Sequence, residues 1–179
     1  MIKRKLLIVL KFNLTMQHKQ ATLEKTLEEL EQYEIKSDLW TRVWKFPSEQ
    51  RFEVAILEKI ISEALKKAGF SRDEIQRAIL VSEEALTNAI KHGNKRNIRK
   101  YITFGFYLFP PENACIAEFF CEDEGNGFNP ERVPNPTEEN NLTKDHGRGI
   151  FLMKNYADGL AYNRKGNRIE WYILHNQNK

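Results

Sequence analysis

The sequence predicts an α/β sandwich of the α+β type, with a mixed sheet that carries helices on one face. Runs that read as short β-strands are separated by longer segments with helical periodicity. Their order is strand, helix, helix, strand, strand, loop, helix, strand, strand, which predicts a helical layer packed on a sheet. At 179 residues, 41% of them hydrophobic, the chain is long enough to bury one core.

The N-terminal part of the chain reads as an addition to this domain. Residues 16–36 are rich in Leu, Glu, Gln and Lys, and their leucines follow helical spacing. This pattern predicts a surface helix, with a coiled-coil arm as the alternative. We therefore expect residues 1–40 to form an N-terminal extension that contains a helix, and residues 41–175 to form the domain.

The first half of the domain reads as one strand and two helices. Arg42–Phe46 alternates between polar and apolar residues, which predicts a strand, and residues 52–65 follow with helical spacing. The next helix has a clear start, because Ser71 is followed three residues later by Glu74 in a capping-box pattern. Its apolar face continues until Gly93, which we expect to end it.

The second half of the domain contains a long polar stretch between its elements. This stretch follows Asp123, is rich in Gly, Pro and Asn, and ends at His146. Irregular segments of this length are commonly functional, so we expect a lid. The predicted elements around it are strands over residues 101–109 and 114–121, a helix over 149–156, and strands over 160–163 and 168–174.

The strongest helix carries a polar pair. Glu84 and Asn88 are four residues apart, so their side chains project from the same face. An amide oxygen can ligate a hard cation such as magnesium, and a carboxylate can accept a proton from an attacking hydroxyl. Two solvent-facing side chains would give the same spacing, so this pair alone does not establish a site.

An acidic, glycine-containing turn follows the second strand of the central pair. Asp123 ends the predicted strand, and Gly125 and Gly127 come next. Glycines allow a tight turn and a close approach of backbone to a ligand. A carboxylate fixed at this point can accept a hydrogen bond from an exocyclic amine such as that of adenine. An ordinary Asp/Gly turn is the alternative.

A second pair of glycines opens the helix after the lid. Gly147, Arg148 and Gly149 precede an apolar helical run, and free amides at such a helix start can face the phosphates of a nucleotide. Each of the three features is common alone. Together they predict three different contacts with one magnesium–nucleotide complex.

Several other functions lack their sequence signals. The chain contains neither a P-loop pattern nor the His-Arg-Asp and Asp-Phe-Gly motifs of protein kinases. Its formal net charge is only +3, with acids and bases interspersed, which argues against direct nucleic-acid binding. Its apolar segments are too short to cross a membrane. We expect a cytoplasmic protein.

The three motifs resemble those of the GHKL ATPase superfamily. Ser82–Gly93 reads SEEALTNAIKHG, which is similar to its N box. Asp123–Phe128 reads DEGNGF and Gly147–Met153 reads GRGIFLM, which are similar to its two glycine boxes. Within the superfamily the likeness is greatest to the small anti-sigma-factor serine/threonine kinases of bacteria. It spans about residues 41 to 175 and leaves the first forty residues outside.

The resemblance implies a Bergerat-type ATP-binding fold with ATP and Mg²⁺ as cofactors. It implies that Asn88 ligates magnesium, Glu84 is the general base and Asp123 recognises the adenine amine. It also assigns the shape of the pocket and its lid to Gly125, Gly127, Gly147 and Gly149. The same likeness implies a phosphate contact for Arg148 and a pocket wall that includes Lys91 or His92. One departure is the stretch Gly166–Ile169, which lacks the threonine that many members carry near the adenine.

The resemblance leaves three functions open. The first is a serine/threonine kinase that phosphorylates a STAS-type anti-anti-sigma protein and sequesters a sigma factor or similar regulator; a homodimer is implied with it. The second is a non-catalytic, ATP-dependent interaction module. The third is a detached histidine-kinase ATP domain with His18 as phosphoacceptor, although the residues after His18 lack the expected Pro-containing context.

Overall fold

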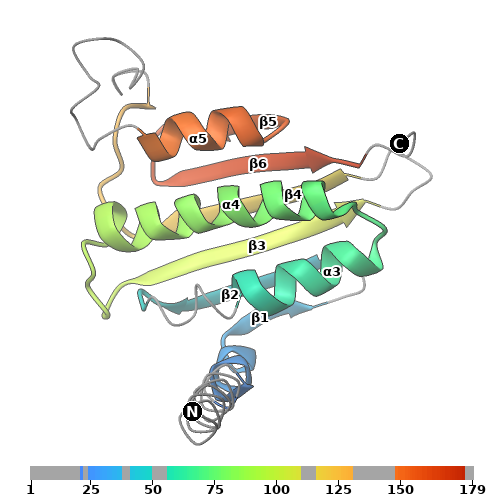
Figure 1. Ribbon diagram of the computed structural model, residues 1–179. Coiled ribbons are helices and arrows are strands. Elements are labelled where there is room, and N and C mark those ends of the chain that lie inside the picture. Colours follow the sequence, from blue (N-terminus) through green and yellow to red (C-terminus); the bar gives the residue numbers. More distant parts are fainter. Residues whose placement is uncertain are drawn as a thin grey trace, which may run out of the picture.

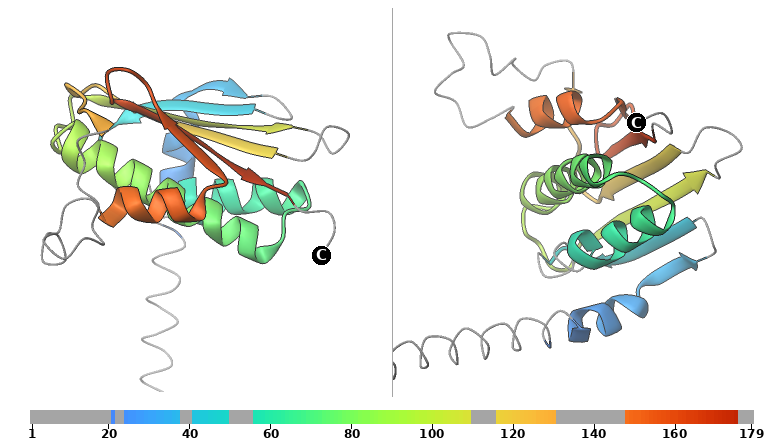
Figure 2. Two further views of the ribbon diagram at one scale, coloured as in Figure 1. Left: turned by 90° about the horizontal axis from the view of Figure 1, so that it is seen from above. Right: turned by 45° about the vertical axis from the view of Figure 1, so that its right-hand side comes forward.

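The computed structural model describes residues 21, 24–37, 41–49, 56–109, 116–130 and 148–175. These residues form two layers, with the helices on one face of a single sheet (Figure 1). Seen along the sheet, α3, α4 and α5 all lie on the same side (Figure 2). The predicted two-layer α+β sandwich is confirmed.

The sheet contains six described strands in the order β1-β2-β3-β4-β6-β5. Every pair of neighbouring strands is antiparallel, so the predicted mixed sheet is wrong. The sequence order of strands and helices does not fix strand direction, and here hairpins join β3 to β4 and β5 to β6. The strands are β1 (Glu34–Ser37), β2 (Thr41–Pro47), β3 (Tyr101–Phe109), β4 (Ile116–Asp123), β5 (Gly159–Tyr162) and β6 (Arg168–Leu174).

The helical layer consists of short helical segments around one long helix, α4. Before it come a π-helical turn, η1 (Ile56–Ile61), and α3 (Ser62–Lys67). The long helix α4 (Arg72–Asn88) continues into a second π-helical turn, η2 (Ala89–Gly93), and α5 (Arg148–Tyr156) packs beside it. The amide of Asn94 donates to the carbonyl of Ala89 at 2.8 Å, so the helix widens in its last turn before it stops.

The core between the layers is aromatic on the sheet side and largely aliphatic on the helix side. Phe119 and Trp171 stack with their ring centroids 5.4 Å apart, and both are almost fully buried. Burying each large apolar side chain stabilises the fold by about 1.5–3 kcal/mol. The facing side chains of α4 include Ala78 and Ala85, whose small size lets the helix lie close to the sheet.

The N-terminal helix is shorter than the sequence predicts. Helical structure ends at residue 31, and Glu34–Ser37 pairs with β2 as an edge strand. The expected continuation to residue 36 is therefore wrong. Leu30 is 1% exposed because its side chain belongs to the core, which attaches this helix to the domain. Residues 1–20 lie outside the described part of the chain, so the coiled-coil alternative is not tested.

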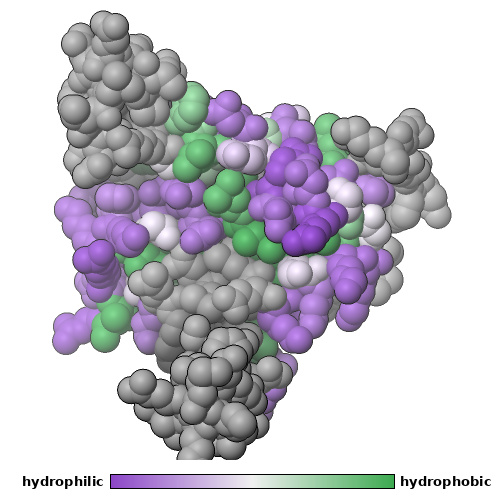
Figure 3. Space-filling view, viewed as in Figure 1, coloured by the Kyte–Doolittle hydropathy of each residue, from purple (hydrophilic) through white to green (hydrophobic). Residues whose placement is uncertain are grey.

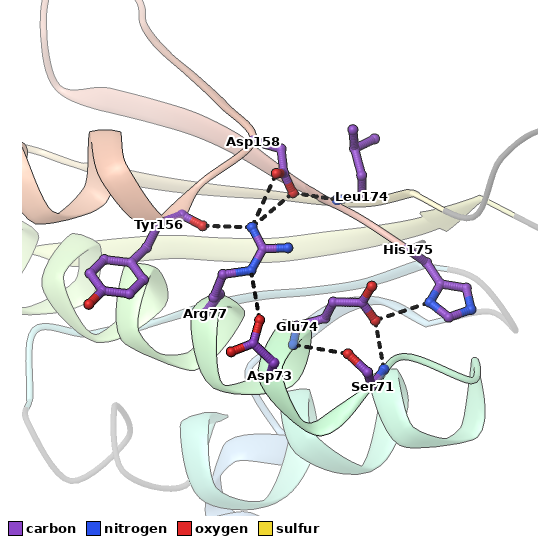
Figure 4. Close-up of polar contacts among 8 residues, drawn as sticks. All are labelled: Ser71, Asp73, Glu74, Arg77, Tyr156, Asp158, Leu174 and His175. Atoms are coloured by element: carbon purple, nitrogen blue, oxygen red, sulfur yellow. Dashed lines mark hydrogen bonds and ion pairs between the residues drawn. The ribbon is translucent and has the colours of Figure 1, made fainter. Parts of the chain in front are cut away.

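The predicted start of α4 is confirmed. The Ser71 hydroxyl accepts a hydrogen bond from the Glu74 amide at 3.3 Å, and the Glu74 carboxylate accepts one from the Ser71 amide at 2.6 Å. The same carboxylate lies 3.0 Å from Nδ1 of His175, the residue after β6 (Figure 4). The first turn of α4 is thus bonded to the end of the sheet.

Arg77, one turn further along α4, forms hydrogen bonds with the C-terminal end of α5 and with Asp158. Arg77 donates to the carbonyl of Tyr156 and to the carboxylate of Asp158, each at 3.1 Å. The Asp158 carboxylate also accepts from the amide of Leu174 at 2.8 Å, so one acid joins α4, the end of α5 and β6 (Figure 4). Because Tyr156 is the last residue of α5, this contact fixes the C-terminal end of that helix.

Candidate functional site

A cavity of about 1100 Å³ lies where the second half of α4 faces the ends of β4 and β6 and the start of α5. A volume of this order is typical of sites for small molecules. Its polar and charged lining includes Glu84, Thr87, Asn88, Lys91, His92, Lys95, Lys100, Asp123, Asn126, Asn129 and Asn167. All three predicted motifs contribute residues, although they are far apart in the sequence.

The predicted helix pair lies on the cavity wall and faces the start of α5. A side chain added at Gly149 would collide with the Glu84 carboxylate and would approach Nδ2 of Asn88 to 3.5 Å. Among the described residues, no group forms a hydrogen bond or ion pair with either side chain. Both polar groups are therefore available to a ligand. They face the cavity, whereas two ordinary surface side chains would face solvent.

The Asp123 carboxylate sits in a tight backbone cradle at the end of β4. Its Oδ1 accepts a hydrogen bond from the Gly125 amide at 2.7 Å. A side chain at Gly93 or at Gly125 would collide with the carboxylate, so glycine is required at both positions. Burial raises the pKa of this carboxyl above its ordinary value of 3.8, while the Gly125 hydrogen bond and nearby Lys165 and Lys100 oppose the rise.

The turn after Asp123 packs on the turn between β5 and β6. Gly127 has a φ of +73° and approaches the carbonyl of Lys165, while Gly166 has a φ of +75° and approaches the carbonyl of Phe128. Neither position has room for a Cβ. This contact brings a fourth segment to the cavity, Gly166–Ile169, at which the resemblance predicts a threonine that this sequence lacks.

The start of α5 is described only in part. Gly147 lies outside the described residues, as does the expected lid between Pro130 and Arg148. The backbone of Arg148 begins α5, whereas its side chain is not described. Gly149 lines the cavity opposite Glu84. The structure thus brings together Glu84, Asn88, Asp123, Gly127 and Gly149, with Gly125 against the Asp123 carboxylate.

The cavity also has an apolar surface that suits a flat ring. Ile150, Met153 and Ile169 contribute to it, together with Tyr162, whose ring meets that of Phe128 edge-on at 5.2 Å. Burial raises the pKa of Tyr162, so its hydroxyl stays neutral. An apolar surface with a few fixed polar groups is the usual composition of a site that binds a heterocycle.

Sequence reasoning missed several residues around the cavity. Asn94 and Asn167 are buried and hydrogen-bonded to the Asp123 turn. Lys95 and Lys100 line the cavity beside Lys91 and His92, so both of the expected wall residues are present. The sequence did contain a signal for the lysines, because residues 91–100 carry five Lys and Arg and no acid, against +3 for the whole chain.

The donor groups fit a magnesium–nucleotide. The cavity offers a carboxylate for an exocyclic amine, an amide and a carboxylate that no described residue engages, and several lysines for phosphates. Among the described residues no three His, Cys, Asp or Glu side chains converge as a metal site. Magnesium nevertheless commonly binds through only one or two protein groups, with phosphates and water as its other ligands.

None of the described helices has the length and apolarity that a membrane span requires.

The fold is an α+β domain with a cavity of the size that small-molecule sites have. Residues 46–172 match the sequence model of the family described as Histidine kinase-like ATPase domain. The chain belongs to this family. The predicted resemblance to the GHKL superfamily is thereby confirmed, and all three motifs lie within the matched residues.

Individual relatives agree with the family. The serine-protein kinase RsbW of Oceanobacillus iheyensis is 24% identical over 127 residues, covering 68% of this chain and 77% of that protein. The RsbW of Staphylococcus epidermidis is 27% identical over 115 residues, covering 60% and 70%. A crystal structure of the RsbU and RsbW domains of a Mycobacterium tuberculosis protein has a TM-score of 0.49 at 11% identity, covering 75% of this chain and 32% of that one.

Proposed function

We propose that this chain binds ATP with Mg²⁺ in the cavity and is a serine/threonine kinase that regulates a sigma factor. The observation that carries the proposal is the convergence of Glu84, Asn88, Asp123 and Gly149 on one cavity, where no described residue forms a hydrogen bond or ion pair with the side chains of Glu84 and Asn88. The family match and the relatives named serine-protein kinase support it.

Each motif has its own task in this proposal. The Asp123 carboxylate accepts a hydrogen bond from the adenine amine, and the apolar surface around Met153 packs on the ring. Asn88 ligates the magnesium ion, which, when bound, neutralises phosphate charge. The start of α5 at Arg148 and Gly149, with Gly147 before it, binds the phosphates. Gly125 and Gly127 keep the turn narrow enough for the nucleotide.

Glu84 is the proposed general base. It removes the proton from a serine or threonine hydroxyl of the protein substrate. The hydroxyl oxygen forms a bond to the γ-phosphorus of ATP, and the bond from that phosphorus to the ADP oxygen breaks. Its place opposite Gly149 suits this task because no side chain separates the carboxylate from the start of α5.

The proposal includes the protein partners. The substrate is a STAS-type anti-anti-sigma protein, and the chain also sequesters a sigma factor or a similar regulator. The protein acts in the cytoplasm as a homodimer, without contact to nucleic acid. Residues 41–175 form the ATP-binding domain, and residues 1–40 form an extension for partner choice or dimerisation.

Calorimetry with ATP and Mg²⁺, followed by transfer of label from [γ-³²P]ATP to the STAS-type proteins of the same genome, tests the proposal. We expect Glu84→Gln to bind ATP but to lose about 10²–10⁴-fold in transfer rate. The matched control is Glu83→Gln, because Glu83 is exposed on the next position of the same helix and does not line the cavity. Equal transfer by wild type and Glu84→Gln would refute the base assignment.

The same experiment separates the alternatives. Uptake of ATP without any phosphoserine or phosphothreonine on a bound partner indicates the non-catalytic interaction module. Acid-labile phosphate on His18 indicates the histidine-kinase reading; this residue lies outside the described part of the chain. If calorimetry detects no uptake of ATP or ADP, the proposed function is wrong.

A further inference from the structure

Two buried asparagines flank the turn that contains Asp123. Asn94 is 1% exposed and follows η2, whereas Asn167 is 7% exposed and precedes β6. A buried amide destabilises the fold unless hydrogen bonds replace those it made with water. The partners of these two side chains therefore indicate what they hold in place.

Asn167 binds the backbone of Asp123 in both directions. Its Nδ2 donates to the carbonyl of Asp123 at 2.7 Å, and the amide of Asp123 donates to the carbonyl of Asn167 at 2.9 Å. The remaining oxygen of the Asn167 side chain accepts from Nδ2 of Asn163 at 3.0 Å. Both ends of the Asn167 amide are thus used, and its orientation is fixed.

Asn94 holds the same turn from the helical layer. Its Oδ1 accepts from the amide of Glu124 at 2.9 Å, and its Nδ2 donates to the carbonyl of Tyr101 at 2.9 Å. Its own backbone amide is bonded to Ala89 in η2. Through Asn94, the peptide that follows Asp123 is therefore connected to η2 and to the start of β3.

The two ties leave one oxygen of the Asp123 carboxylate for a ligand. Oδ1 is used by the Gly125 amide, and among the described residues Oδ2 has no hydrogen-bond partner. Hydrogen bonds at residues 123 and 124 fix the backbone that carries the carboxylate, while Gly93 and Gly125 enclose it. A fixed carboxylate oxygen favours a base whose exocyclic amine donates a hydrogen bond to it. A base with an oxygen at that position is disfavoured, because two hydrogen-bond acceptors would then face each other.

We infer that Asn94 and Asn167 are positioning residues that set the selectivity of the site for 6-aminopurine nucleotides by holding Asp123. The inference rests on the proposed function and deepens it. Asn167 lies in the stretch that lacks the threonine expected from the resemblance, so here base selectivity depends on a residue that fixes the aspartate. Neither asparagine needs to touch the nucleotide.

Calorimetry with ATP and with inosine triphosphate tests the inference, since inosine carries an oxygen where adenosine carries the 6-amine. We expect wild type to prefer ATP by at least about tenfold, the effect of one hydrogen bond to a charged group. We define the Kd ratio as the Kd of inosine triphosphate divided by the Kd of ATP. In Asn167→Ala and in Asn94→Ala this ratio falls by about three- to tenfold. In Asp123→Ala it falls to about one, and adding Asn167→Ala does not change it further.

Glu74→Gln is the matched control for loss of stability. Glu74 is buried and hydrogen-bonded like the two asparagines, but it lies at the other end of α4. We expect this variant to have a lower Tm and an unchanged ratio of Kd values. Should Asn167→Ala not fold, as judged by circular dichroism, Asn167→Ser replaces it because serine keeps a donor of smaller reach.

The outcomes are distinct. An unchanged ratio in both asparagine variants, or a lower ratio in Glu74→Gln as well, overturns the inference while leaving ATP binding intact. A further fall of the ratio when Asn167→Ala is added to Asp123→Ala shows that Asn167 contacts the base itself, which also overturns it. If wild type takes up neither nucleotide, the proposed function and the inference fail together.

Discussion

The polar side chains at the two ends of α4 have different surroundings. At the N-terminal end, the side chains of Ser71, Glu74 and Arg77 all have hydrogen-bond partners within the protein (Figure 4). At the other end, Glu84 and Asn88 face the cavity, and the described residues offer them no partner. Groups satisfied by the fold stabilise it, whereas partly buried groups that the fold leaves unsatisfied are available for a ligand.

The strongest test of this contrast is Asn88→Ala. If Asn88 ligates magnesium as proposed, removing its amide oxygen should weaken Mg²⁺-dependent binding of ATP by about 10- to 100-fold. Urea unfolding in the absence of nucleotide should change little, since the Asn88 side chain forms no hydrogen bond within the described part of the chain. Calorimetry with and without Mg²⁺ measures the first effect. A large loss of stability without a loss of affinity would reverse the assignment of this end of the helix.

Arg77→Ala should have the complementary effect. The variant loses the hydrogen bonds to Tyr156 and Asp158, and we expect the free energy of unfolding to fall by about 1–3 kcal/mol. ATP affinity of the folded protein should change far less than in Asn88→Ala. Urea titrations give the stability and calorimetry at low temperature gives the affinity. An equal loss of affinity in both variants would remove the distinction between the two ends.

Ser71→Ala sharpens the comparison at smaller scale. Loss of an N-cap hydroxyl typically costs about 1 kcal/mol, and the partner carboxylate of Glu74 remains bonded to His175. We expect a lower Tm with unchanged nucleotide binding. Ser71→Asp, which keeps a capping oxygen, should restore most of the stability. A failure of aspartate to rescue would show that the hydroxyl does not act as a cap.

The smallest expected effect is a gain of stability on replacing Asp123 by asparagine. Burial raises the pKa of Asp123, so the folded protein binds this proton more tightly than the unfolded chain does, and stability declines as pH rises past 3.8. Asp123→Asn should therefore be slightly more stable than wild type at pH 7, and the difference should vanish below pH 3.8. Urea unfolding between pH 3 and 8 measures it. The effect is small because the carboxyl is half-exposed and screened by solvent. Loss of stability at pH 7 would contradict it.

The sequence predicts those features that depend on local spacing. The Ser71/Glu74 capping box fixes the start of α4, and the four-residue spacing of Glu84 and Asn88 fixes their common face. These predictions succeed because helix geometry alone relates such neighbours. The convergence of the three motifs on one cavity agrees with the prediction, while the roles given to their residues stay predictions.

Features that depend on tertiary contacts escaped prediction. Nothing local distinguishes Asn94 and Asn167 from the other asparagines, because only their burial against the Asp123 turn makes them special. The direction of the strands was not predicted for the same reason. The strand β1 was not predicted either, because its residues continue a segment of helical composition and only their pairing with β2 makes them a strand. Local propensity is a weak guide wherever long-range pairing decides the structure.

The contact between Arg77 and the end of α5 has a mechanical consequence. Arg77 fixes α5 at Tyr156, and Gly149, in the first turn of the same helix, lies seven residues away, about 10 Å along the helix axis. A tilt of about 10° about this point would displace Gly149 by about 2 Å relative to Glu84. It would also disturb the packing of Met153, because this side chain of α5 lies in the same core as Trp171. The hydrogen bonds of Arg77 thus make the C-terminal end of α5 the point about which such a tilt would turn.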